Sequence, residues 1–503
     1  MESLSPHFPA LIIIVPLIAA LLTSAAGWLN RRLCFPFAAL GLFTSLLVSI
    51  GLLASVLDKD VILYRLGGWP APWGILYRID RLNGLVLVVI FFVAFLNLIA
   101  NKRTVEESFP EQLGGFYALY VLFVTGLSGM VATGDAFNLY VLLEISSLTG
   151  YALIGIGNER APLAGLNYLF MGTIGASLYL LGIGFLYLMT GSLNMTDIAS
   201  LLPGFYGSPV MVLAFLLCMT GLFIKMALFP LHAWLPNAYS FSPSASIGVI
   251  APLTTKVMIY VMIRITFDVF TPDFSFKMMH LGEVMVWLAV AAIIMGSLFA
   301  LAQTRLKRML TYVIIAEVGY MVGGFWLGNR MAVTGAVLHI LNDAVMTLCI
   351  FLAAGAVVYQ ICGDDFEDLK GLFRKMPISM AAFTVAALSL IGVPPTCGFF
   401  SKWYLISGGI AAGHYGFVVA LLFSSLVNAV LFFRIIEIGY FEPFSEGEGG
   451  HGAHHGPPAM EIREAPAGML ACLVLAAVSL IVLGIYTGDI VTRIIDLAIP
   501  PAI

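Results

Sequence analysis

Long apolar stretches separated by short polar segments run along almost the whole chain. A helix that crosses a bilayer needs about 20 apolar residues, and each stretch is continuous over roughly that length. The strands of a membrane β-barrel would instead alternate over about ten residues. Helices also satisfy their own backbone hydrogen bonds in lipid, so the pattern predicts an all-α polytopic protein with about fourteen transmembrane helices. The predicted spans are 9–29, 36–57, 82–100, 113–132, 135–156, 164–190, 209–229, 243–267, 281–303, 308–327, 331–359, 377–410, 415–440 and 466–487.

The composition agrees with this membrane class. Of the 503 residues, 60% are hydrophobic and 10% are charged, whereas soluble proteins carry about 25% charged residues. The mean hydropathy is +1.00. We therefore expect a multi-pass protein of the plasma or inner membrane, in contact with the lipid bilayer. No basic patch accompanies the net charge of −4, so no nucleic-acid partner is expected.

The sequence contains no motif for chemistry on a bound substrate. The six cysteines lie far apart and form no Cys-x-x-Cys or Cys/His arrangement, so neither a metal site nor an iron–sulfur cofactor is expected. A phosphate-binding glycine loop, a dinucleotide-binding motif and a serine nucleophile elbow are also missing from the sequence. We expect no cofactor and no catalytic residues in this chain.

Lysine and arginine residues are unevenly divided between the two sides of the membrane. Cytoplasmic loops carry an excess of these residues, and the loops after odd-numbered spans hold twelve of them against eight for the other loops and the C-terminal tail. This bias predicts that both termini lie on the non-cytoplasmic side. The first group is Arg31, Arg32, Lys102, Arg103, Arg160, Arg305, Lys307, Arg308, Lys370, Arg374, Lys375 and Arg463, and the second is Lys59, Arg65, Arg78, Arg81, Arg264, Lys277, Arg330 and Arg493.

Prolines interrupt two of the predicted spans. Pro230 lies at the end of span 7, and Pro394 and Pro395 lie inside span 12. A proline removes a backbone donor and clashes with the preceding turn, so each helix is expected to break there. Broken helices at membrane depth line polar cavities, and paired breaks are typical of inverted repeats.

The breaks also suggest how the chain is divided. Spans 4–8 and 9–13 are two sets of five, and each set contains one broken helix. We expect N-terminal helices in residues 1–112 and five-helix repeats in 113–267 and 281–440. A loop rich in Gly, His and Glu and a terminal helix would occupy 441–503.

Three lysines stand alone in apolar stretches: Lys225, Lys256 and Lys402. A charged amine at the bilayer centre costs about 3 kcal/mol or more, and an amine can lower this cost by releasing its proton. Repeated buried lysines therefore indicate a proton path. The alternatives are that a lysine snorkels to the interface or belongs to an ion pair that only fixes helix packing.

Glu144 is the most isolated acid, in span 5, and it is the natural counter-charge for a buried lysine. An opposite charge nearby keeps a lysine protonated, and moving that charge releases the proton. A pair of Glu144 with a buried lysine can therefore act as a switch. It can also act only as a link between helices.

Span 11 carries His339 and Asp343, which are four residues apart and so share one helix face. Histidine titrates near neutral pH, which suits a proton relay, but a packing histidine held by a carboxylate fits equally well. Glu317 in span 10 and His232 next to the first break are further possible members of the relay.

Four segments resemble a known family. They are 221–239 (GLFIKMALFPLHAWLPNAY), 246–264 with Lys256, 307–312 (KRMLTY) and 392–402 (GVPPTCGFFSK). Together they resemble the antiporter-like subunits of respiratory Complex I and of Mrp sodium/proton antiporters. The lysines at 256 and 402 look most like the Mrp D subunit and the equivalent subunit of membrane-bound hydrogenases.

The resemblance implies a fold of fourteen transmembrane helices with two inverted five-helix repeats and a chain of charged residues in the membrane plane. It implies that Glu144 and Lys225 form an ion-pair switch, that Lys256 is the central relay and that Lys402 leads to the exit. Span 11 departs from the family pattern, since Asn342-Asp343-Ala344 stands where the family often has Asn-His-Ala. His339, Asp343 and Glu317 are expected to substitute there.

The leading hypothesis is a proton-translocating subunit of a multisubunit membrane complex. The complex would be an Mrp-type cation/proton antiporter or a redox-driven machine related to Complex I or hydrogenases. Its partners would be the other membrane subunits, with protons and sodium as candidate ions. The alternatives are a stand-alone secondary transporter of a small solute and a redox subunit that binds quinone.

Overall fold

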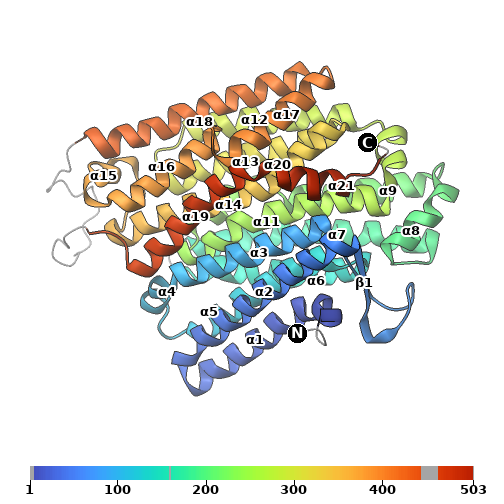
Figure 1. The fold of residues 1–503 in the computed structure, drawn as a ribbon, viewed down its shortest axis with the longest axis horizontal. Coiled ribbons are helices and arrows are strands. Elements are labelled where there is room, and N and C mark those ends of the chain that lie inside the picture. The colour runs from blue at the N-terminus through green and yellow to red at the C-terminus, as the bar shows by residue number, and fades with distance from the viewer. Residues whose placement is uncertain (1–4, 158–159, 443–462, 502) are drawn as a thin grey trace.

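The structure is a computed structural model that describes residues 5–157, 160–442, 463–501 and 503, and it is an elongated bundle of helices (Figure 1). Most of the predicted loop rich in Gly, His and Glu lies outside these residues. Among the described residues, twelve helices are long and apolar enough to cross a membrane. This confirms the predicted all-α membrane class, while the count of fourteen spans stays a prediction. The twelve are α1 (Phe8–Leu29), α2 (Cys34–Lys59), α3 (Arg81–Ala100), α5 (Leu113–Ala132), α6 (Ala136–Gly155), α7 (Ala161–Thr190), α11 (Ser244–Arg264), α12 (Gly282–Leu301), α13 (Leu306–Trp326), α14 (Arg330–Ile361), α18 (Tyr415–Phe441) and α19 (Ala467–Ile485).

The two remaining predicted spans are each divided into two pieces. In span 7, α9 (Pro209–Lys225) is followed by a turn and then α10 (Leu235–Phe241). In span 12, α16 (Pro377–Ile391) is followed by α17 (Cys397–Ala411). Gly392 ends α16 in the left-handed region at φ 96°, where a glycine fits without strain.

Short elements connect the long helices. The other α-helices are α4 (Lys102–Ser108), α8 (Met195–Leu201), α15 (Leu372–Lys375), α20 (Thr487–Ile490) and α21 (Asp496–Ala498), and β1 (Val61–Arg65) pairs antiparallel with β2 (Leu76–Asp80). Short 3-10 or π segments are η1 (Ser5–His7), η2 (Arg31–Leu33), η3 (Leu66–Gly68), η4 (Leu202–Phe205), η5 (Ile265–Val269), η6 (Asp273–Met278), η7 (Phe366–Leu369) and η8 (Val491–Ile495).

The β1–β2 hairpin marks one end of the bundle, here called the hairpin end, and α4 and α15 lie at the opposite, far end (Figure 1). Both chain ends approach the hairpin end. The His7 Nδ1 atom lies 3.1 Å from the Tyr64 hydroxyl of β1. Arg81, the first residue of α3, donates a hydrogen bond to the backbone oxygen of Arg493 at 3.3 Å. The first and last helices of the chain are therefore tied to the same end of the bundle.

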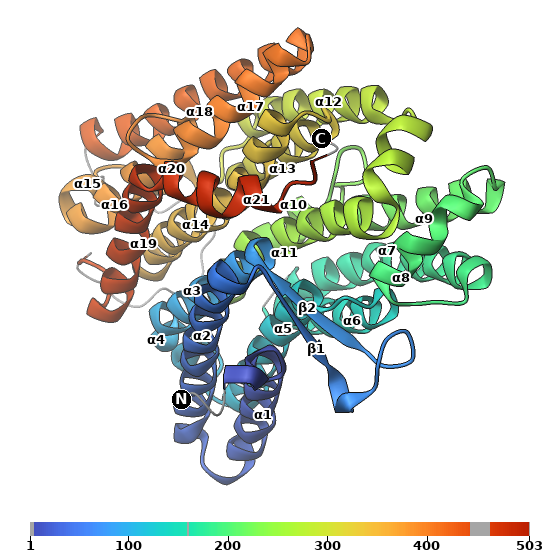
Figure 2. The same ribbon diagram turned by 45° about the vertical axis from the view of Figure 1, so that its right-hand side comes forward.

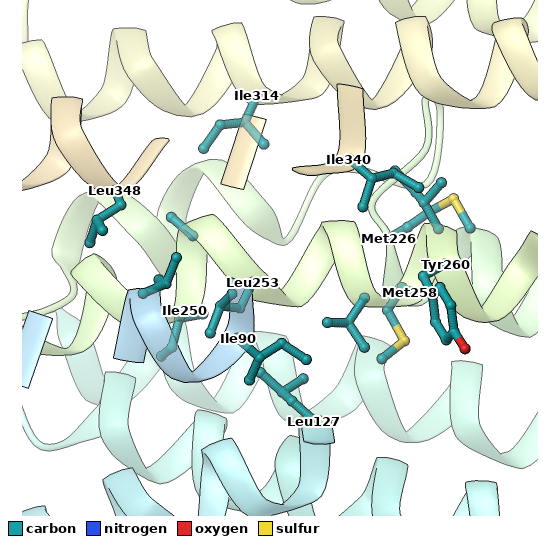
Figure 3. Packing of buried hydrophobic residues seen from close by; sticks show 14 of the residues in the cluster. Ile90, Leu127, Met226, Ile250, Leu253, Met258, Tyr260, Ile314, Ile340 and Leu348 are labelled. Atoms are coloured by element: carbon teal, nitrogen blue, oxygen red, sulfur yellow. The ribbon is translucent and has the colours of Figure 1, made fainter. Parts of the chain in front are cut away.

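Two helices form the centre of the bundle. All residues from 245 to 263 of α11 and from 332 to 357 of α14 are buried, and the two helices pack against each other. Figure 2 shows α11 between the N-terminal helices and the group α12–α18. Figure 3 shows Ile250 and Leu253 of α11 next to Ile90 of α3, with Ile314 of α13 and Ile340 of α14 on the other side of the helix. Polar groups on α11 and α14 are thus kept from lipid.

Candidate functional site

The first candidate group lies where α6 meets the end of α9. Lys225 is the last residue of α9 and is 3% exposed. Its Nζ atom lies 3.9 Å from Glu144 Oε1, and it donates hydrogen bonds to Ser147 Oγ at 2.7 Å and to the Tyr151 hydroxyl at 3.1 Å. The ammonium is therefore held mainly by two neutral hydroxyls, with the carboxylate at the limit of an ion pair.

Helix periodicity explains this arrangement. Glu144, Ser147 and Tyr151 are three and four residues apart on α6 and so share one face. Glu144 stands out in the sequence as a lone acid in an apolar run, whereas the hydroxyls of Ser147 and Tyr151 do not. Their spacing from Glu144 is the signal that could have identified them.

The second group lies at the crossing of α11 and α14. Lys256 Nζ is 2.9 Å from Asp343 Oδ2, and it donates hydrogen bonds to Thr347 Oγ1 at 3.2 Å and to the backbone oxygen of Ala251 at 3.3 Å. Thr347 in turn donates to Asp343 Oδ1 at 2.8 Å. Because Asp343 and Thr347 are four residues apart, α14 presents both to Lys256 from adjacent turns.

Glu317 of α13 lies beside this ion pair. It is fully buried and close enough to Asp343 for the two carboxyl groups to interact, and neither of its oxygens has a hydrogen-bond partner within the described residues. Two carboxyl groups this close cannot both ionise without a large repulsion. The pair can therefore hold one proton between them, next to the Lys256 ammonium.

His339 and Lys402 form the third group, between α14 and α17. His339 is fully buried, and its Nδ1 atom lies 2.8 Å from Ser401 Oγ. Ser401 directly precedes Lys402 in α17, so this contact brings the imidazole to the neighbourhood of the third lysine. The ring of Tyr320 lies under both groups, 5.5 Å from the His339 ring and 5.2 Å from Lys402 Nζ.

The break between α16 and α17 supplies the partners of Lys402. Its Nζ atom donates hydrogen bonds to the backbone oxygens of Leu390 at 2.6 Å and Ile391 at 3.2 Å, and to Ser425 Oγ of α18 at 3.1 Å. The last carbonyls of a helix have no intrahelical partner and carry a partial negative charge. Because α16 ends at Ile391, these carbonyls can hold an ammonium ion.

Other predicted members lie apart from these groups. Pro230, with His232 two residues later, is in the turn between α9 and α10, and the His232 ring stacks between Phe229 and Phe299 at centroid distances of 5.1 and 6.3 Å. Pro394 and Pro395 lie in the segment that separates α16 from α17.

A separate cluster of charges closes the hairpin end of α11. Arg264 pairs with Asp80, the residue that caps α3, and with Asp268 at 3.2 Å. Arg78 lies 3.7 Å from Asp268. Burial alone would raise the pKa of Asp80, but the Arg264 guanidinium, its hydrogen bond and the backbone N–H of Asn83 outweigh burial and hold that pKa below its usual range. Asp80 is therefore ionised at neutral pH and ties the hairpin to α11.

The three groups share the features that proton transfer needs. Each contains a buried lysine and at least one hydroxyl, carboxyl or carbonyl that can accept a hydrogen bond from it. Within the described residues, no three His, Cys, Asp or Glu side chains gather in a way that could hold a metal ion.

Comparisons with known proteins show the family of the chain. Residues 133–428 match the family described as NADH:quinone oxidoreductase/Mrp antiporter, TM. NADH-quinone oxidoreductase subunit N of Desulforudis audaxviator (strain MP104C) is 43% identical over 99% of this chain and 99% of that protein. The D subunit of the Na(+)/H(+) antiporter of Bacillus subtilis (strain 168) is 29% identical over 85% of this chain and 86% of its own length. A chain of the membrane-bound sulfane sulfur reductase, an archaeal respiratory membrane complex, superposes with a TM-score of 0.87 at 30% identity, covering 97% of this chain and 96% of that one.

Proposed function

Because the chain belongs to the NADH:quinone oxidoreductase/Mrp antiporter transmembrane family, we propose that it moves protons through the partly exposed Glu144 and the buried Lys225, Lys256, Asp343, His339 and Lys402. It does so as an antiporter-like subunit of a multisubunit membrane complex. The relatives named above are subunits of such complexes by their names. The other membrane subunits of this complex are its partners.

The observation that carries the proposal is the Lys256–Asp343 pair with Glu317 beside it. Asp343 and Glu317 are fully buried and Lys256 is 2% exposed. A buried ion pair is a weak source of stability, since an apolar replacement is often neutral or stabilising. A second fully buried carboxyl group beside the pair has no hydrogen-bond partner within the described residues, and it supplies a place where a proton can be stored and released.

The three groups follow one another across the bundle, and this order gives the path of proton transfer along the membrane plane. The Glu144–Lys225 pair lies on α6 and α9, Lys256 is at the centre, and His339 and Lys402 follow on α14 and α17. Lys256 shifts its proton toward Asp343 and Glu317, and His339 passes it through Ser401 to the neighbourhood of Lys402. Lys225 and Lys256 share no hydrogen-bond partner, so the step between them needs water as a carrier.

The broken helices support two five-helix units in 113–267 and 281–440. The fourth predicted span of each set is the broken one, with α9 and α10 in the first and α16 and α17 in the second. Lys225 lies before the break in the first unit, and Lys402 lies after the break in the second. The loops at the far end of the bundle carry the excess of lysine and arginine, so we assign the far end to the cytoplasmic side. Both termini then lie on the non-cytoplasmic side.

The test is proton flux in membrane vesicles that contain the assembled complex, followed with a pH-sensitive dye. Lys225→Ala and Lys256→Ala are each expected to slow the flux by at least about tenfold, the scale of a lost proton-transfer group. Lys277→Ala is the matched control, because Lys277 is an exposed lysine that pairs with Asp273 one helical turn away. Wild-type flux in both buried-lysine variants, with normal assembly, would exclude the relay.

A further inference from the structure

Lys307 is a buried lysine that the relay does not use. Its sequence position predicts a loop cation, yet it lies in the first turn of α13 and is only 7% exposed. Its Nζ atom donates a hydrogen bond to Ser244 Oγ at 3.2 Å. Ser244 is the first residue of α11, the helix that carries Lys256.

The surroundings of Lys307 oppose a permanent positive charge. The first turns of α13 and α11 both present backbone N–H groups with a partial positive charge. The nearest acid, Asp364, already accepts two hydrogen bonds from Arg305, at 2.9 and 2.7 Å. Among the described residues, no ion pair within 4.0 Å joins Lys307 to a carboxylate. A lysine that served only as a surface charge or a structural anchor would gain nothing from this place.

Further buried hydroxyl groups lie on α11 next to Lys256 and on α10, the helix that precedes Ser244. The side-chain oxygens of Tyr239, Thr254 and Thr255 are buried, and none of them has a hydrogen-bond partner within the described structure. Buried polar groups are satisfied by protein or by ordered water, so these hydroxyls mark a route that water can occupy. Lys256 itself points back along α11 toward this route, since its Nζ atom contacts the backbone oxygen of Ala251.

We propose that Lys307 and Ser244 form a second entry gate, through which protons from the far end reach Lys256 without passing Lys225. In this step the Lys307 ammonium gives one N–H proton to the hydroxyl and water chain that begins at Ser244. The neutral amine then takes a proton from bulk water at the far end, so its charge is restored. The inference rests on the proposed function, because it needs Lys256 as the acceptor.

The decisive comparison is between Lys307→Gln and Lys307→Arg in vesicles that contain the assembled complex. Arginine keeps the charge and the donor to Ser244 but cannot release its proton in a protein. A gate that transfers protons therefore fails in both variants, and flux falls by roughly half in each, because entry through Lys225 remains. Lys102→Met is the control, since Lys102 is a half-exposed lysine at the same end.

Two results would overturn the gate. One is wild-type flux in Lys307→Gln, and the other is full flux in Lys307→Arg, which would make Lys307 only an anchor between α11 and α13. Ser244→Ala removes the first proton acceptor and must also slow the flux. If Lys307→Gln lowers the amount of assembled complex, the flux of Ser244→Ala decides whether the gate exists. Lys256→Ala distinguishes a failure of the proposed function from a failure of the gate alone. If it transports normally, the proposed function falls. If it is inactive while the Lys307 variants are normal, only the gate falls.

Discussion

Lys256 of α11 and Asp343 of α14 form an ion pair 2.9 Å long in which neither side chain is more than 2% exposed. The pair joins two deeply buried helices at the centre of the bundle. Thr347 closes the arrangement, because it donates to Asp343 and accepts from Lys256. Each partner therefore depends on the other for its charge.

Asp343→Asn should abolish most of the transport and also lower the stability of the assembled complex. Removing one partner of a buried ion pair costs about 3–5 kcal/mol, and the remaining Lys256 loses its proton acceptor. We expect proton flux to fall by at least about tenfold, measured in vesicles, together with a lower melting temperature. Thr347→Val is the control, since it removes only hydrogen bonds of about 1 kcal/mol each. Equal flux in the wild type and Asp343→Asn would contradict this prediction.

Tyr151→Phe should weaken the hold on Lys225 without removing the lysine. The variant loses the 3.1 Å hydrogen bond but keeps the ring that packs against Tyr168 at 4.5 Å. Lys225 is then free to move toward Glu144, and flux is expected to fall about fivefold, as for a bond of about 1 kcal/mol. Tyr187→Phe, at an exposed tyrosine, should transport normally. A Tyr151→Phe rate equal to the wild-type rate would show that the hydroxyl does not position Lys225.

Tyr320 should influence Lys402 through its ring. The Lys402 Nζ atom lies 5.2 Å from the ring centroid, a distance at which a cation and an aromatic ring attract by about 0.5–2 kcal/mol. Tyr320→Phe keeps the ring and should transport close to the wild-type rate, whereas Tyr320→Leu should be several-fold slower. Flux assays on the two variants side by side test this. If the two rates are the same, the contact with the ring has no role.

Asp80→Asn should destabilise the hairpin end at neutral pH. Asparagine still caps α3 but leaves the buried Arg264 with less counter-charge, at a cost of about 3 kcal/mol. Asp80 has a folded-state pKa below its usual range, so its stabilisation is fully present above the unfolded-state pKa of about 3.9. It is lost as the pH falls through the lower, folded-state value.

The difference in melting temperature between the wild type and Asp80→Asn should therefore be constant from pH 5 to 8 and shrink only in more acidic buffer. Thermal unfolding of the purified complex across this range gives the measurement. A difference that grows on acidification has the wrong sign for this ion pair.

The fold class could be read from the sequence because bilayer thickness fixes the length of an apolar run. The helices α1, α5 and α14 begin and end within a few residues of the predicted spans. The pairing of Lys256 with Asp343 could not be predicted, because it depends on how α11 crosses α14 and not on spacing within either helix. The sequence connected Asp343 only with His339, its neighbour on the same helix face.

Lys307 shows the same limit from the other direction. Lys307 lies in a cluster with Arg305 and Arg308, and such a cluster of charges is typical of a loop. A mean hydropathy taken over the cluster does not distinguish its one buried member. Its burial arises from the packing of the first turn of α13 against the start of α11, a contact between residues 63 positions apart. His232 is the converse case, since its motif drew attention to it while its ring packs between two phenylalanines.

The unbroken course of α14 has a mechanical consequence. The helix has 32 residues and is therefore about 48 Å long. Arg330 ties its first turn to Asp496 at one end, and Gln360 ties its last turn to the Glu464 backbone at the other. Such a rod transmits a push or a twist along its axis, so a displacement imposed at either membrane surface moves Asp343 and His339 by the same amount. A single stroke of α14 would then part Asp343 from Lys256 and His339 from Ser401 together.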